Sequence, residues 1–163
     1  MALFRYLMLL SLIVWLGGII FFAAVLTRTA FSVLPTHHLA ANLVNRSLAS
    51  LHWMGIVSGV VFLVSSMCYA RLQDGSAHPL AWRHILICAM LLLTLISQFA
   101  VSPKMASLRA SLGDMDNVAA TDPARIEFNT LHGWSTRLEG GVLLIGLVVV
   151  YLTVAALQHS TRS

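Results

Sequence analysis

The stretch YLMLLSLIVWLGGIIFFAAVL, residues 6–26, decides the fold, because it carries no charged side chain over its whole length. A helix that crosses the hydrocarbon core of a bilayer needs about 20 mostly apolar residues at a rise of roughly 1.5 Å per residue. Three more long apolar runs follow, and the sequence predicts membrane-spanning helices over residues 6–27, 48–71, 84–102 and 128–157. The predicted fold class is all-α: an integral membrane four-helix bundle, with residues 1–163 as a single polytopic membrane domain.

Composition supports this fold class and excludes most soluble ones. Of the 163 residues, 58% are hydrophobic and 10% are charged, whereas a soluble domain carries about 25% charged residues. The first run is longer than the roughly 7 to 15 apolar residues of a secretion signal, so we expect it to be retained as a helix. We therefore expect a multi-pass membrane protein, in the inner (cytoplasmic) membrane if the source is bacterial.

The net charge of +4 is typical of helix ends anchored at lipid headgroups. The basic residues are dispersed between the spans and form no block, so we expect the lipid bilayer as a partner and no nucleic acid. They are also spread almost evenly over the two sides, which leaves the orientation in the membrane undetermined.

Two connections join spans on the side away from the termini. The first, between the first two spans, holds His37 and His38, which follow no helical stripe. The second, after Pro103, is expected to lie outside the membrane, with one short interfacial helix over residues 106–112 between Pro103 and the interruptions at Gly113 and Pro123.

Polar side chains gather toward this same side, because the second span begins, the third ends and the fourth begins there. Ionisable groups at membrane depth are costly unless they are paired or face a polar interior, so their clustering indicates a functional site. The residues concerned are His52, Gln98, Lys104, Arg109, Glu127, His132, Arg137 and Glu139.

Helical spacing selects a few members of this group. His132, Ser135 and Glu139 stand at i, i+3 and i+7 and so share one stripe of the fourth helix. His52 shares a stripe with Gly55 and Gly59, a small-xxx-small pattern that lets a neighbouring helix approach closely. We therefore expect His52, His132 and Glu139 to converge on a ligand, with the surrounding residues Ser135, Gln98, Lys104, Arg109 and Arg137. Taken alone, each histidine is equally typical of an interfacial residue bonded to a carbonyl group or water.

Catalysis has little support in the sequence. No serine or cysteine comes with a recognisable base and orienting acid, and no nucleotide-binding or metalloprotease motif is present. Cys68, His84 and Cys88 meet at the short connection between the second and third spans, but their spacing is not that of a metal motif, and the sequence leaves a second site there undecided. Binding or transport of a small ligand is expected ahead of an enzymatic activity.

Three blocks carry a resemblance to a known family: WLGG at residues 15–18, SPKMASLR at 102–109 and FNTLHGWS at 128–135. With them the chain resembles a family of small four-span membrane proteins of unknown function, related to eukaryotic transmembrane protein 205. The resemblance extends over nearly the whole chain. It implies an integral membrane protein and no established reaction.

A partial resemblance, limited to the WLGG block and the four-span plan, connects the chain to the membrane domain of copper-resistance proteins and to the four-helix haem-binding oxidases of porphyrin synthesis. It implies that His52 and His132 are ligands of haem or copper, the latter with Met54 or Met105.

Two other interpretations remain open beside this metal or haem site. In the first, Lys104, Arg109 and Arg137 meet a carboxylate or phosphate, such as a lipid headgroup, while the histidines and Glu139 orient it. In the second, the chain is a non-catalytic membrane subunit or partner protein, forming a homo-oligomer or a membrane complex through the faces of Gly55, Gly59, Gly140 and Gly141.

Overall fold

The computed structural model describes residues 1–74, 82–113 and 117–159, except for the side chains of residues 74 and 156–159. Four continuous helical stretches make up nearly all of these residues. The first consists of α1 (Ala2–Phe21), one widened π turn η1 (Phe22–Leu26) and α2 (Thr27–Val33), and the second is α3 (His37–Asp74). The third consists of α4 (Trp82–Ile96), a second π turn η2 (Ser97–Val101) and α5 (Ser102–Leu112), and the fourth is α6 (Pro123–His159).

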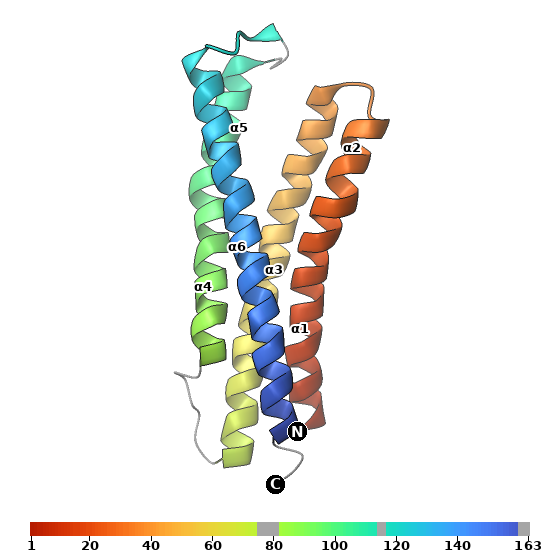
Figure 1. Ribbon diagram of the computed structural model, residues 1–163, viewed down its shortest axis with the longest axis vertical. Coiled ribbons are helices and arrows are strands. Elements are labelled where there is room, and N and C mark those ends of the chain that lie inside the picture. Colours follow the sequence, from red (N-terminus) through yellow and green to blue (C-terminus); the bar gives the residue numbers. More distant parts are fainter. Residues whose placement is uncertain (75–81, 114–116, 160–163) are drawn as a thin grey trace.

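Each of the four stretches is long and apolar enough to cross a membrane. The protein is therefore an all-α four-helix membrane bundle, as the apolar runs predict. The start of α1 and the end of α6 lie at one end of the bundle, and the α2–α3 connection lies at the other (Figure 1).

The helices extend well beyond the predicted spans. The first connection shrinks to residues 34–36, so His37 and His38 begin α3, and their placement in a connection without helical structure was wrong. Thr36 caps this helix, because its Oγ1 accepts a hydrogen bond from the Leu39 N–H at 3.2 Å. Charged and polar residues end the hydrophobic span without ending the helix.

The third helix also continues past its predicted end. A separate interfacial helix over residues 106–112 was wrong, because α5 follows η2 directly and ends only at Gly113, which has a φ of 66°. Pro103 has no N–H to donate to the Phe99 carbonyl, and its ring crowds that carbonyl group. The wider π turn immediately before it accommodates the proline within the helix.

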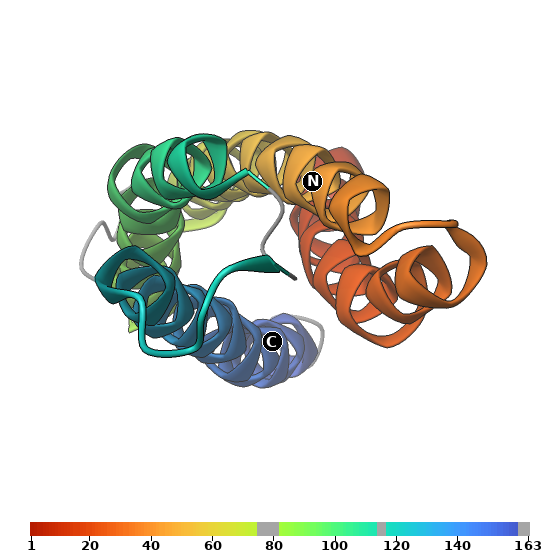
Figure 2. The same ribbon diagram turned by 90° about the horizontal axis from the view of Figure 1, so that it is seen from above.

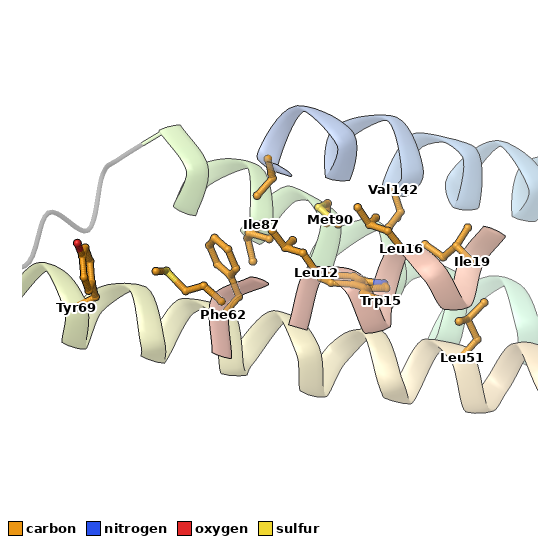
Figure 3. Packing of buried hydrophobic residues seen from close by; sticks show 12 residues of the cluster. Leu12, Trp15, Leu16, Ile19, Leu51, Phe62, Tyr69, Ile87, Met90 and Val142 are labelled. Carbon is orange, nitrogen blue, oxygen red and sulfur yellow. The ribbon is translucent and has the colours of Figure 1, made fainter. Parts of the chain in front are cut away.

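Trp15 organises the closed half of the bundle, where all four helices meet. Its side chain is 2% exposed and lies in a cluster with Leu12, Phe62, Met90 and Val142 (Figure 3). A Cβ atom at Gly55 would overlap the Trp15 indole ring, and one at Gly59 would meet the same ring and Leu91.

The small-xxx-small pattern of α3 therefore packs α1 and α4 against α3 within the chain. Gly55 is buried under Trp15, and Gly59 is buried under Trp15 and Leu91, so neither glycine faces outward toward a second copy. Gly141 lies 3.5 Å from Leu93, measured from an added Cβ, whereas Gly140 has open space around it.

Toward the other end, the bundle divides into two hairpins. One consists of the first helical stretch with α3, and the other of the third stretch with α6, and their ends diverge (Figures 1 and 2). A second buried cluster, Val101, Met105 and Phe128, lies within the α5–α6 hairpin alone. Because this core does not extend to α2 and α3, the side chains leave space between the hairpins.

Candidate functional site

Three helices contribute a polar cluster at the point where the hairpins begin to diverge. His52 of α3 is 1% exposed. Its Nε2 lies 2.6 Å from Glu139 Oε1 of α6, and its Nδ1 lies 2.8 Å from Gln98 Oε1 of η2. The buried imidazole of one hairpin thus contacts the other hairpin through both of its nitrogens.

The π turn explains how Gln98 reaches this ring. Ser97, the residue before it, is fully buried, and its hydroxyl has no hydrogen-bond partner among the described residues. In an ordinary helix two consecutive residues point about 100° apart, but the wider turn lets both Ser97 and Gln98 face the interior.

The protonation of His52 is coupled to the orientation of Gln98. A ring that meets two acceptor oxygens can donate to both only as an imidazolium. A neutral ring fits the same positions when the Gln98 amide turns, so that its NH₂ group donates to Nδ1 while Nε2–H donates to Glu139. Either arrangement of protons on the ring and the amide fits the observed positions of the three side chains.

Glu139 also faces a cavity of about 450 Å³ between the hairpins, which we call the inner cavity. Its walls come from the first helical stretch, α3, α5 and α6, and they are mainly apolar. The apolar lining residues include Ile19, Phe22, Leu48, Met105 and Leu143, and the polar ones include Ser102, Arg109, His132, Ser135 and Glu139.

A second cavity of about 400 Å³, the outer cavity, adjoins the inner one. The two share the lining residues Phe31, Ala41, Arg109 and His132. The rest of the outer lining is His37, His38, Gly113, Arg125 and Asn129, with Phe128. The described polar residues that line the outer cavity are basic or uncharged, whereas those that line the inner cavity include the acidic Glu139.

Arg109 is held at the junction of the two cavities by two contacts. Its Nη1 donates a hydrogen bond to the Ala41 carbonyl oxygen at 3.2 Å, across the two hairpins. Its guanidinium also lies 5.1 Å from the centre of the Phe128 ring. His132 lies on the same aromatic ring in a parallel, offset arrangement, with 6.5 Å between the centroids. Phe128 therefore orients both polar groups that join the cavities.

The remaining predicted residues divide into two groups. Ser135 is buried and lines the inner cavity beside Glu139. Lys104 instead forms an ion pair with Glu127 on the surface, and the Arg137 guanidinium lies 5.4 Å from the centre of the exposed Trp134 ring. Neither of these cations lines either cavity.

The two predicted histidines are engaged separately. His52 is bonded to Gln98 and Glu139, whereas His132 stacks on Phe128 and is exposed toward both cavities. The site predicted from the sequence lacks His37, His38 and Arg125, because the predicted helices end at the limits of the apolar runs. Two capping residues mark the true starts of these helices: Thr36 before the two histidines and Asp122 before Pro123.

The arrangement offers little to a metal ion. Both nitrogens of His52 are hydrogen-bonded, which leaves this ring no lone pair for haem or copper in the observed conformation. Within residues 1–74, 82–113 and 117–159, no three His, Cys, Asp or Glu side chains gather as metal ligands. His84, proposed beside Cys68 and Cys88, is within hydrogen-bond distance of Ser66 Oγ at 2.7 Å.

Comparison with known proteins gives one result. A family model described as a domain of unknown function, DUF4149, matches residues 10–113. The match covers the first three helical stretches, with His52, Gln98 and Arg109, and stops before the FNTLHGWS block of α6. No curated protein and no solved structure matches the chain.

Proposed function

The chain belongs to the DUF4149 family, and since that description assigns no activity, we propose from the site itself that the protein binds a small amphipathic molecule between its two hairpins. The observation that carries this proposal is the inner cavity, whose mainly apolar walls also hold polar groups such as Arg109, Ser135 and Glu139. Such a combination is typical of sites that bury a largely apolar ligand and fix its orientation through polar contacts.

The inner cavity offers such a ligand both apolar side chains and a carboxylate. Phe22 and Leu48 line it together with Leu143, and these side chains would contact an apolar chain. Glu139 lines it too, and its Oε1 is hydrogen-bonded to His52 Nε2. The cavity therefore offers an apolar chain its apolar walls and leaves the polar contacts to a few side chains.

Access from the lipid is supported by the small side chains on one flank. Ala23 on η1 and Gly140 on α6 both line the inner cavity and both are exposed. A molecule dissolved in the bilayer would enter between these two helices without passing through water.

Three further proposals extend this one. The resemblance to the family of transmembrane protein 205 supports a role in the membrane and no particular reaction. The multi-pass architecture supports an inner-membrane location if the source is bacterial. Binding or transport is proposed ahead of catalysis, because Ser135, the buried hydroxyl beside Glu139, has no base and orienting acid arranged as in a hydrolase.

A matched pair of glycines on α6 tests the binding proposal. A Cβ atom at either Gly140 or Gly133 would meet nothing within 4 Å, but only Gly140 lines the inner cavity. The probe is a long-chain alkyl alcohol carrying a diazirine, photoactivated with the protein in lipid nanodiscs and mapped by mass spectrometry. We expect crosslinks on Phe22, Leu48 and Leu143, lost in Gly140→Phe and retained in Gly133→Phe.

The opposite pattern would contradict the proposal. Crosslinks spread over lipid-facing side chains such as Leu144 and Tyr151, and unchanged by Gly140→Phe, would mean that the probe labels the outer surface and does not enter the cavity.

A further inference from the structure

The outer cavity differs from the inner one in its charge. Arg109, Arg125, His37, His38 and His132 line it, and no Asp or Glu is found among its described lining residues. We propose that the outer cavity is an anion subsite, which takes the phosphate or carboxylate headgroup of an amphiphile whose apolar chain occupies the inner cavity. This inference rests on the proposed function and adds the chemical class of the ligand.

Arg109 is the residue best arranged to bind the headgroup. Its guanidinium has five N–H donors, of which the described contacts use one, on the Ala41 carbonyl oxygen. The guanidinium also lies 5.1 Å from the centre of the Phe128 ring, a contact that limits its movement, and its planar fork can bind two oxygens of one anion. A lysine at this position would offer the charge without this geometry.

The histidines add donors around the same space. Asn42 Nδ2 donates to His38 Nε2 at 3.0 Å, so the neutral His38 ring carries its proton on Nδ1. His132 stacks on Phe128 and lines both cavities, which places it where a headgroup and a chain would join. Arg125 also lines the outer cavity and donates a hydrogen bond to the Val118 carbonyl oxygen.

The length of α6 separates the two parts of such a ligand. Glu139 follows His132 by seven residues on α6, a rise of about 10 Å at 1.5 Å per residue. An anion beside Arg109 and His132 would therefore lie well away from Glu139, whose carboxylate is the only one among the described residues of the inner lining and is itself paired with His52. The charge distribution favours an anionic head at the outer end and a neutral chain at the inner end.

Two other cations provide matched controls. Lys104 lies on α5, five residues before Arg109, and is paired with Glu127 on the surface. Arg137 lies on α6 over Trp134. Neither lines a cavity, so removing either charge changes the net charge of the protein without changing the proposed subsite.

The experiment compares three probes by native mass spectrometry in a non-ionic detergent. Phosphatidylglycerol carries an anionic head, phosphatidylcholine with the same chains carries a zwitterionic head, and glycerol phosphate carries the anion without a chain. The protein variants are Arg109→Gln and Arg125→Gln, with Lys104→Gln and Arg137→Gln as controls, each checked for an unchanged melting temperature.

We expect phosphatidylglycerol to bind about tenfold more tightly than phosphatidylcholine, because both heads carry a phosphate but the choline ammonium would lie among the cations of the outer cavity, and such like-charge contacts weaken binding. Arg109→Gln should reduce phosphatidylglycerol to the level of phosphatidylcholine, Arg125→Gln should reduce it partly, and the two controls should leave it unchanged. If Arg109→Gln lowers the melting temperature, the anion subsite is tested by Arg125→Gln alone, whose partial loss of phosphatidylglycerol binding would support it.

The other outcomes separate this inference from the proposed function. Equal binding of both lipids, insensitive to Arg109 and Arg125, would overturn the anion subsite and leave the amphiphile site standing. Glycerol phosphate binding as tightly as the lipid would support the anion subsite and count against a role for the inner cavity. Equal losses in all four variants would indicate general surface electrostatics and overturn the subsite. Binding of none of the three probes would overturn both proposals.

Discussion

The buried His52 and the half-buried Glu139 form a pair, 2.6 Å apart, between helices that belong to different hairpins. The pair lies where the closed half of the bundle ends and the inner cavity begins. Because Gln98 engages the other nitrogen of the ring, the same imidazole also joins η2 to this point. The cluster therefore connects the packing of the bundle with the floor of the proposed binding site.

A double-mutant cycle on this pair should show strong coupling. His52→Leu alone leaves a largely buried carboxylate without its hydrogen bond, which costs about 1 to 3 kcal/mol of unfolding free energy. Glu139→Leu leaves the ring nitrogen unsatisfied at a similar cost. The double variant removes both polar groups and should recover most of the loss, since a buried pair replaced by apolar residues is often close to neutral.

The measurement is unfolding in mixed micelles followed by circular dichroism. Glu139→Gln serves as the control, because its amide oxygen still accepts from His52 and its loss should be the smallest. Losses that simply add in the double variant would show that the two residues act independently and that the pair does not hold the hairpins together.

Packing of α1 on α3 gives a second stability prediction. Gly55→Ala places a methyl group into the Trp15 indole ring, which is rigid and 2% exposed, so we expect a loss of about 1 to 3 kcal/mol. Gly17→Ala on α1 meets nothing within 4 Å and should be neutral or stabilising by up to about 1 kcal/mol. The same unfolding assay compares them.

Replacing the ring tests the cause of this loss. In a Trp15→Phe background, the added methyl group of Gly55→Ala has more room, and its cost should fall below that in the wild type. An unchanged cost would show that the loss comes from the helix backbone and not from the contact with Trp15.

The sequence predicts the closed half of this protein better than its open half. Charge-free runs identify the four spans, and Gly55 and Gly59 on the stripe of His52 predict that this histidine faces a neighbouring helix. Glu139 is found on the same principle, from its spacing to His132 and Ser135. These features depend on local periodicity, which a single sequence shows directly.

The open half depends on features that periodicity does not show. A π turn shifts the register of one helix, so the contact of Gln98 with His52 requires knowledge of where that turn falls. Arg109 reaches the Phe128 ring, beside which His132 also lies, because α5 extends past its apolar run, and a hydropathy limit cuts that helix short. Lys104 and Arg137 were grouped with them because membrane side alone does not give helix face.

The start of α6 provides a third prediction. Asp122 Oδ1 accepts hydrogen bonds from the Ala124 N–H at 2.8 Å and the Arg125 N–H at 3.3 Å, next to Pro123 in the first turn. Asp122→Ala should cost about 1 kcal/mol, whereas Asp122→Asn retains an acceptor and should cost less. Hydrogen exchange of residues 124–128 should rise in the alanine variant alone; equal exchange in both would assign the effect to charge instead of the cap.

The path of the chain through the membrane gives the last prediction, which tests the architecture independently of any ligand. Thr36 lies in the connection between α2 and α3, and Thr121 lies just before α6, whereas Gln73 lies near the far end of α3. With four spans, the first two positions share one side of the membrane and Gln73 lies on the other.

Cys68 and Cys88 are first replaced by Ala, and a single cysteine is placed at each position in turn. An impermeant maleimide added to sealed vesicles should either label both Thr36→Cys and Thr121→Cys and spare Gln73→Cys, or label Gln73→Cys and spare the other two. Detergent should make all three variants reactive. Labelling of Thr36→Cys and Gln73→Cys from the same side would show that α3 does not cross, and the four-span bundle would then be wrong.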